Sequence, residues 1–180
     1  MRIIKKIFLF IFAVLIVGLV AAAFMKKDFA VEKQVVINLP KDSVFKFIKY
    51  AKNQEKYSVW NKMDPNMKKH ESGTDGTVGF VTGWESTNKN VGVGEMEIKN
   101  IIEGQRVDFE LRFKEPMEAT NNAYLTTESI TPNQTSVKWG FNGKSPYPFN
   151  LMMAFVDMDK VVGKDFQEGL NNLKIVLEKK

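Results

Sequence analysis

The chain has 180 residues, of which 44% are hydrophobic and 26% are charged, a balance typical of one globular domain with an appendage. It contains no cysteine, which excludes disulfides, thiolate metal sites and cysteine nucleophiles. The formal net charge of +5 belongs to the N-terminus, because residues 1–27 hold five basic residues and no acidic one. The remainder is electrically balanced, so the charge gives no reason to expect a nucleic-acid partner.

An apolar run begins at Ile7 and ends at Met25, with three basic residues before it and two after it. At about 1.5 Å per residue, such a helix just crosses a hydrocarbon core of about 30 Å. We therefore expect residues 1–27 to be an N-terminal membrane anchor with basic flanks. The charge bias favours a single-pass protein whose domain, residues 28–180, lies outside the cytoplasm. The alternative is a signal peptide cleaved at the small residues 21–23, which would release an exported protein.

The first element of the domain is a predicted strand at residues 29–39. Val31, Val35 and Ile37 share one side of it, although Lys33 interrupts that side. Pro40 suits the first turn of a helix, and the apolar spacing that follows predicts a short helix ending near residues 52–53. A second short helical piece is expected to carry Tyr57 and Trp60.

From His70 onward, apolar and polar residues alternate between tight turns, which predicts about six short strands in an antiparallel meander. The clearest strand is 106–113, where Phe109 and Leu111 point inward and Arg112 points outward. Glycines at 92 and 94 lie within a predicted strand, where they allow the sheet to bend.

The last quarter, roughly residues 150–180, predicts one amphipathic helix of about 28 residues, or roughly 40 Å. One side of this helix carries a mostly apolar stripe, made of Phe155, Asp159, Val162, Phe166, Leu170, Leu173 and Leu177 and widened by Met152 and Val156. Gly163 and Gly169 flank this stripe, and each costs up to about 1 kcal/mol relative to alanine in a helix. They indicate either the close approach of a strand or space left open beneath the helix. The order of strand, two short helices, about six strands and long helix predicts an α+β helix-grip fold.

This order of elements, together with residues 36–45 (VINLPKDSVF), resembles the opening of the START-like, or SRPBCC, superfamily, which includes the Bet v 1 allergens and lipid-transfer domains. Segments 60–65, 76–79, 112–116 and 163–174 are similar to its bacterial polyketide cyclase/dehydrase-like branch, in which an N-terminal membrane helix is common. The resemblance covers residues 29–180. It implies a Bet v 1/START-like antiparallel sheet curved around the C-terminal helix, with a cavity between them. It supplies no catalytic residues, because the superfamily shares no catalytic set.

Large apolar side chains on the strands and at the start of the long helix are the candidate ligand-binding residues. They are Phe80, Trp84, Phe109, Tyr124, Trp139, Phe141, Met152, Met153 and Val156. Such walls suit a hydrophobic small molecule or lipid. Tyr124, Glu95 and Arg112 are the polar candidates nearest the cavity. A single histidine, in a charged run at position 70, and no cysteine leave no metal site and no cofactor to expect.

The leading hypothesis is therefore a membrane-anchored START-like domain that binds a hydrophobic small molecule or lipid without catalysis. One alternative is an enzyme of the polyketide cyclase/dehydratase kind, which would need one or two acids inside an apolar pocket. The second alternative is a non-catalytic scaffold whose pocket is filled by its own side chains.

Overall fold

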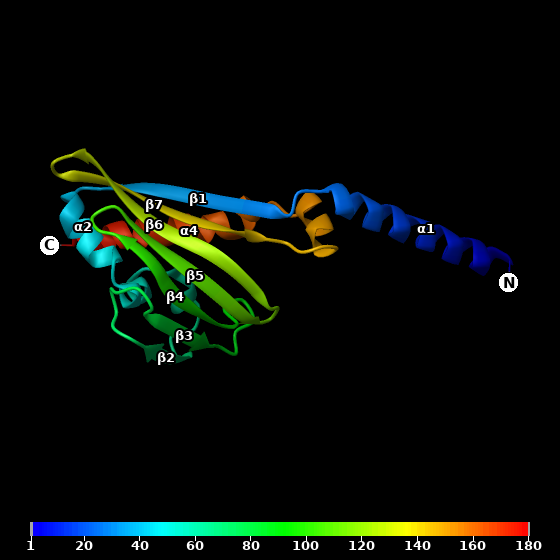
Figure 1. Cartoon of the computed structure of the whole chain (residues 1–180), viewed down its shortest axis with the longest axis horizontal. Coiled ribbons are helices and arrows are strands. Elements are labelled where there is room, and N and C mark those ends of the chain that lie inside the picture. The colour runs from blue at the N-terminus through cyan, green and yellow to red at the C-terminus, as the bar shows by residue number, and fades with distance from the viewer. Residues whose placement is uncertain (1, 180) are drawn as a thin grey trace.

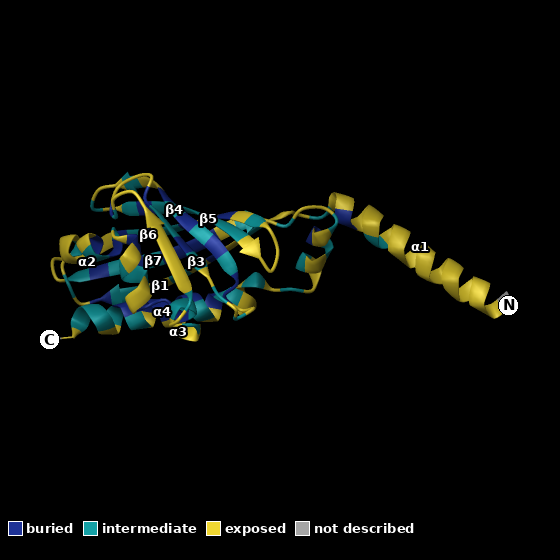
Figure 2. Ribbon diagram, turned by 90° about the horizontal axis from the view of Figure 1, so that it is seen from below, coloured by how far each residue is buried: buried dark blue, intermediate teal, exposed yellow. Residues whose placement is uncertain are grey.

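A computed structural model describes residues 2–179 and consists of a projecting N-terminal helix and one α+β domain (Figure 1). The projecting helix, α1 (Arg2–Phe24), is exposed along nearly its whole length, whereas the buried residues gather in the domain (Figure 2). It is long and apolar enough to cross a membrane, a property that membrane spans and signal sequences share.

The domain is built on one seven-stranded antiparallel sheet in the order β1-β7-β6-β5-β4-β3-β2. The strands are β1 (Asp28–Ile37), β2 (Lys68–Ser72), β3 (Val81–Glu85), β4 (Val93–Ile102), β5 (Arg106–Glu115), β6 (Ala119–Thr131) and β7 (Gln134–Lys144). Six of them form the predicted meander, and β1 joins it by pairing with β7. β4 has a register shift at Val93/Gly94. Of the two glycines predicted within this strand, Gly94 lies in β4 and Gly92 precedes it.

Helix α4 (Met158–Glu178) packs on β1 and β7 and buries Phe166, Leu170 and Leu173. The sheet and this helix form the predicted helix-grip arrangement. The predicted close approach at the two helical glycines is also present. A Cβ atom at Gly169 would lie 2.8 Å from the Trp139 ring, and one at Gly163 would lie 2.8 Å from the Lys33 side chain.

The prediction of one helix over residues 150–180 is wrong at its start. A short 3-10 helix, η2 (Phe149–Ala154), comes first, and the chain then leaves helical conformation before α4 begins. Asp157 sets the new start, because its carboxylate accepts a hydrogen bond from the Asp159 backbone N–H at 3.0 Å. An aspartate at this position satisfies one of the amide groups that a helix N-terminus leaves free.

Three short helices close the domain: α2 (Lys41–Ile48), η1 (Ala51–Lys56) and α3 (Val59–Met63). The predicted single helix up to residues 52–53 is therefore two pieces, and η1 is 3-10. Asp75, in the loop between β2 and β3, holds the start of η1, because its carboxylate accepts hydrogen bonds from the backbone N–H groups of Ala51 (2.8 Å) and Lys52 (3.2 Å).

The two ends of the domain differ in packing. At the end away from α1, α2 packs on β6 and β7 over a core of fully buried aliphatic residues: Ile37, Val44, Ile48, Ile98, Val107, Leu125, Val137, Leu170 and Leu173. Towards α1, the interior is aromatic and less completely filled. The candidate ligand-binding site lies in this second half.

Candidate ligand-binding site

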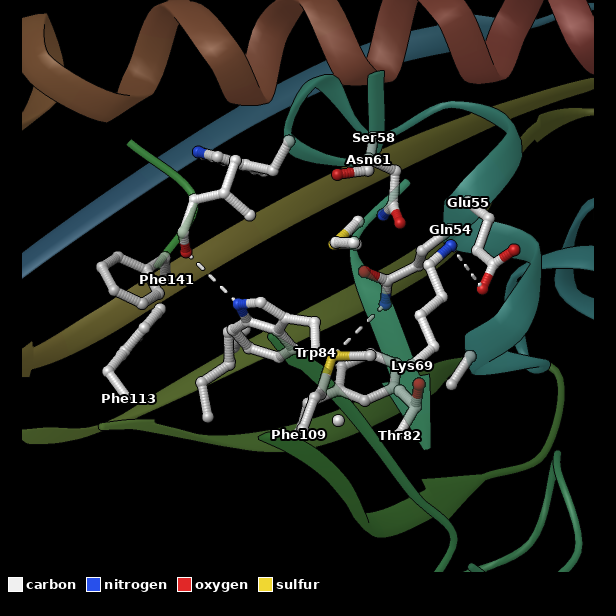
Figure 3. Close-up of a pocket in the computed structure, with 18 of the residues that line it drawn as sticks. Gln54, Glu55, Ser58, Asn61, Lys69, Thr82, Trp84, Phe109, Phe113 and Phe141 are labelled. Carbon is white, nitrogen blue, oxygen red and sulfur yellow. Dashed lines mark hydrogen bonds and ion pairs between the residues drawn. The ribbon is translucent and has the colours of Figure 1, made fainter. Parts of the chain in front are cut away.

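A cavity of about 270 Å³ lies between the concave face of the sheet, helix α4 and the two short helices η1 and α3 (Figure 3). Small-molecule sites have volumes of about 300–1,000 Å³, and this cavity is close to the lower limit of that range. Alternation along the strands aims every second side chain into it. The apolar wall consists of Ala51, Trp60, Met67, Trp84, Val91, Met96, Phe109, Leu111, Phe113, Ala123, Trp139, Phe141, Val162 and Phe166.

Trp139 is the centre of the inner wall and is only 4% exposed. Its ring makes edge-on contacts with the rings of Tyr57, Trp60 and Phe166, at centroid distances of 5.6, 6.3 and 4.8 Å. Edge-to-face pairs of this kind contribute about 0.5–1.5 kcal/mol each beyond the burial of area. The aromatic cluster therefore gives the cavity a stiff wall.

Trp84 forms part of the wall nearest the open edge of the sheet. Its indole Nε1 donates a hydrogen bond to the Val91 carbonyl oxygen at 3.2 Å, and its ring lies 6.0 Å from that of Phe113. The partner of Trp84 in the neighbouring strand is Gly94, where a Cβ atom would lie 2.7 Å from the indole. Glycine at this position lets the indole lie flat across β4.

Polar side chains gather at the mouth of the cavity, on η1, α3 and β2. Lys52 pairs with Glu71 at 2.9 Å, and Lys69 pairs with Glu55 at 3.0 Å. The hydrogen bond and the charge of Glu71 raise the pKa of Lys52, so this lysine stays positively charged. The mouth therefore offers charges of both signs above an apolar interior, which suits an amphipathic ligand.

Four of the nine predicted site residues line the cavity: Trp84, Phe109, Trp139 and Phe141. Phe80 is buried just before β3, in the core rather than in the cavity wall. Met152 and Met153 lie in η2 and Val156 follows it, so none of these three lines the cavity. They miss it because the long helix begins later than predicted.

Tyr124 points away from the cavity, from the opposite face of β6. Its hydroxyl donates a hydrogen bond to the Glu32 carboxylate, and the Arg106 guanidinium lies 4.0 Å from its ring centroid. Burial and the hydrogen bond to Glu32 raise its pKa to about 12. The prediction that Tyr124 lines the cavity is wrong, because the even-numbered residues of β6 face outward.

Glu95 and Arg112 also lie on the outer face of the sheet. Arg112 pairs through Nε with Glu95 and through Nη1 with Glu97, both at 2.7 Å. The hydrogen bonds and the charge of Arg112 hold the pKa of both glutamates below the ordinary value. The outward direction predicted for Arg112 is confirmed, and its cluster stabilises the sheet rather than the site.

The sequence reasoning did not assign Gln54, Ser58, Asn61 and Lys69 to the site. These residues reach the cavity because η1, α3 and β2 fold across its mouth, a tertiary arrangement that leaves no periodic signal. Tyr57 lies behind the wall, where its hydroxyl has no hydrogen-bond partner among the described residues. Within residues 2–179, no cluster of three His, Asp or Glu side chains is arranged to hold a metal ion.

Comparison of the sequence with protein-family models and with curated proteins finds no significant match. Solved structures do match. Norcoclaurine synthase from Thalictrum flavum has a TM-score of 0.62 and 9% identity, over 87% of this chain and 98% of that one. The Aha1 dimer from Colwellia psychrerythraea has a TM-score of 0.57 and 15% identity, over 83% of this chain and 96% of that one. Ara h 8.0201 has a TM-score of 0.50 and 14% identity, over 83% of this chain and 97% of that one. At these identities the similarity concerns the fold alone, and the domain therefore has a Bet v 1/SRPBCC-like fold of the helix-grip type, preceded by an apolar helix.

Proposed function

We propose that this protein is a membrane-anchored binding domain that holds a hydrophobic small molecule or lipid in the cavity between its sheet and α4. The observation that carries this proposal is the aromatic cavity of about 270 Å³, closed on the inside by the Trp139 cluster and with its charged side chains at the mouth. Pockets with apolar walls and a few polar groups bind apolar or amphipathic molecules. The open volume also supports binding over a scaffold with a filled interior.

The ionisable residues around the cavity support binding over a cyclase or dehydratase. A general acid or base acts from a position against the substrate, with a pKa tuned by its surroundings. The ionisable side chains lining this cavity are Lys52, Glu55 and Lys69. All three are exposed at the mouth, and two of them pair with each other.

A contact between α1 and the domain supports an anchor that stays attached. Asn150 is fully buried, and its side-chain amide donates hydrogen bonds to the backbone oxygens of Ala22 (2.6 Å) and Met25 (3.3 Å). Signal-peptide cleavage within residues 21–23 would remove at least part of this contact. N-terminal sequencing of the membrane-extracted protein should therefore find α1 intact, whereas a sequence that begins at Phe24 would contradict the anchor.

The side of the membrane follows from the basic residues, three before the apolar run and two after it. We place the domain outside the cytoplasm. A reporter fused after Lys180 should be inactive if it functions only in the cytoplasm, and activity there would reverse this topology.

The ligand is tested by native mass spectrometry of the full chain extracted in mild detergent. The variant Ala123→Leu extends a side chain from β6 into the cavity between Phe109 and Phe141 and should abolish the bound mass. Ala119→Leu makes the same change on the same strand outside the lining and should retain it. An empty wild-type protein, or equal retention by both variants, would contradict the proposal.

A further inference from the structure

The segment between β7 and α4 packs on α1 rather than on the sheet. Figure 1 shows η2 beside the end of α1 that adjoins the domain. Asn150 makes the two hydrogen bonds to α1 described above, and the Leu151 side chain lies 3.5 Å from the position that a Cβ atom of Gly18 would occupy. The last carbonyl groups of a helix have no partner within it, so a buried asparagine amide fixes η2 at this place.

The outer side of this segment is apolar and uncovered. Phe149, Met152 and Phe155 are exposed, Phe155 to 86%, and Phe24 at the end of α1 is exposed to 88%. Residues 145–156 contain no charged side chain. An exposed apolar patch of this kind marks a surface that another apolar phase or partner covers.

The position of the patch along α1 indicates that lipid is what covers it. Gly18, which contacts Leu151, lies seven residues before Met25, or about 10 Å along the helix axis. The segment therefore reaches back beside the apolar part of α1. Short amphipathic elements in a membrane interface bury their apolar side by about 5–10 Å, and aromatic side chains are enriched at that level.

The backbone of the segment also suits a water-poor layer, where unpaired amide groups are costly. The N–H groups of Asn150, Leu151 and Phe155 donate hydrogen bonds to the carbonyl oxygens of Pro146, Pro148 and Met152 at 3.1, 3.2 and 2.9 Å, respectively.

We propose that residues 147–156 form a second membrane contact, which lies in the interfacial layer of the bilayer that α1 spans. The proposal rests on the anchoring part of the proposed function. The patch continues the apolar surface of α1, which is why its occupant is lipid rather than a protein.

This contact also orients the cavity. Phe141 lies three residues before the end of β7, where β7 pairs with the start of β1, and Phe113 lies beside the β5–β6 turn at the same end of the sheet. Both line the cavity. A segment seated in the interface holds this end of the cavity, which is separate from its charged mouth, towards the bilayer.

The absence of native cysteine makes a direct test simple. A fluorescent probe that is sensitive to polarity is attached to single-cysteine versions of the full chain, at Phe155→Cys, at Val14→Cys within α1, and at Asn133→Cys in the far β6–β7 turn. The proteins are reconstituted in vesicles of phosphatidylcholine and phosphatidylglycerol that carry nitroxide-labelled acyl chains. We expect quenching and a blue-shifted emission at positions 14 and 155, and neither at 133.

Each other outcome has one meaning. Quenching at 14 without quenching at 155 would overturn the second contact and leave the anchor standing, with the patch free for a protein. No quenching at 14 would overturn the anchor, and the second contact with it. Quenching at both positions, with no ligand in native mass spectrometry, would support the second contact and refute the cavity's proposed role.

Discussion

Gly163 and Gly169 allow the substitution of glycine by alanine to be compared at two positions of one helix, with different expected effects on stability. A Cβ atom at Gly169 would lie 2.8 Å from an edge carbon of the Trp139 ring. A Cβ atom at Gly163 would lie 2.8 Å from the carboxylate of Asp159 and from Cε of Lys33, the ends of two flexible side chains. The Trp139 ring is held by three other rings, whereas the Lys33–Asp159 pair is partly exposed and can move.

The magnitudes follow from these neighbours. Each change to alanine gains up to about 1 kcal/mol of helix propensity. At position 163 the only cost is a shift of a surface ion pair that contributes about 0–1 kcal/mol. At position 169 the cost is overpacking against the Trp139 ring, which three other rings hold in place, about 1–3 kcal/mol. We therefore expect Gly163→Ala to be neutral or stabilising and Gly169→Ala to be less stable than Gly163→Ala by up to about 3 kcal/mol.

Thermal unfolding of the two full-length variants in the same detergent measures the difference, at about 2–4 °C per kcal/mol for a chain of this size. The added methyl group at 169 also pushes Trp139 towards the cavity, so the bound mass in native mass spectrometry should fall only in Gly169→Ala. Equal melting temperatures together with equal ligand retention would refute the packing of Trp139 against α4.

Three further predictions concern stability in the full chain. Phe166→Ala should lower the free energy of unfolding, measured with a chemical denaturant, by about 3–5 kcal/mol, or by less because the side chain already borders a cavity. Lys164→Ala, at an exposed position, should change it by less than about 0.5 kcal/mol. Equal effects would mean that this face of α4 is not the buried one. Tyr57→Phe removes a buried hydroxyl without a partner and should stabilise the protein by up to about 1–3 kcal/mol, and a clear loss on urea unfolding would indicate a missed hydrogen bond. Because Arg112 lowers the pKa of its two glutamate partners on β4, their contribution is present above the ordinary pKa of about 4.3 and is lost as the pH falls below it. Unfolding free energies measured between about pH 5 and pH 3 should therefore decline less steeply in Arg112→Gln, and an unchanged slope would contradict this role.

β1 and β4–β7 could be predicted because each alternates between a buried and an exposed face, and the order of the meander follows from tight turns. β2 offers no such signal, because all five of its residues are exposed. β6 is the exception in its side-chain directions. It is rich in polar residues, so the contrast that would have placed Tyr124 outside is weak in the sequence. The predicted start of α4 is wrong for a different reason. Met152 and Val156 continue the helical spacing of apolar residues, but spacing does not reveal which surface covers them, and in the structure their segment packs on α1.

Two charged residues that interrupt apolar patterns in the sequence form a pair in the structure. Lys33 interrupts the buried side of β1, and Asp159 interrupts the apolar stripe of α4. In the structure their side chains form an ion pair at 2.8 Å between the strand and the first turn of the helix. In the sequence each charge is only an irregularity in its own pattern. Neither pattern predicts that the two residues are close in space.

For a protein anchored as proposed above, the open edge of the sheet has a consequence in a crowded bilayer. β2 is the last strand, and all five of its residues, Lys-Lys-His-Glu-Ser, are exposed. Free strand edges pair with one another, and confinement to a plane increases how often anchored copies meet. Lysines along such an edge oppose that pairing through repulsion and hydration. Copies anchored in this way would collide edge to edge without joining their sheets.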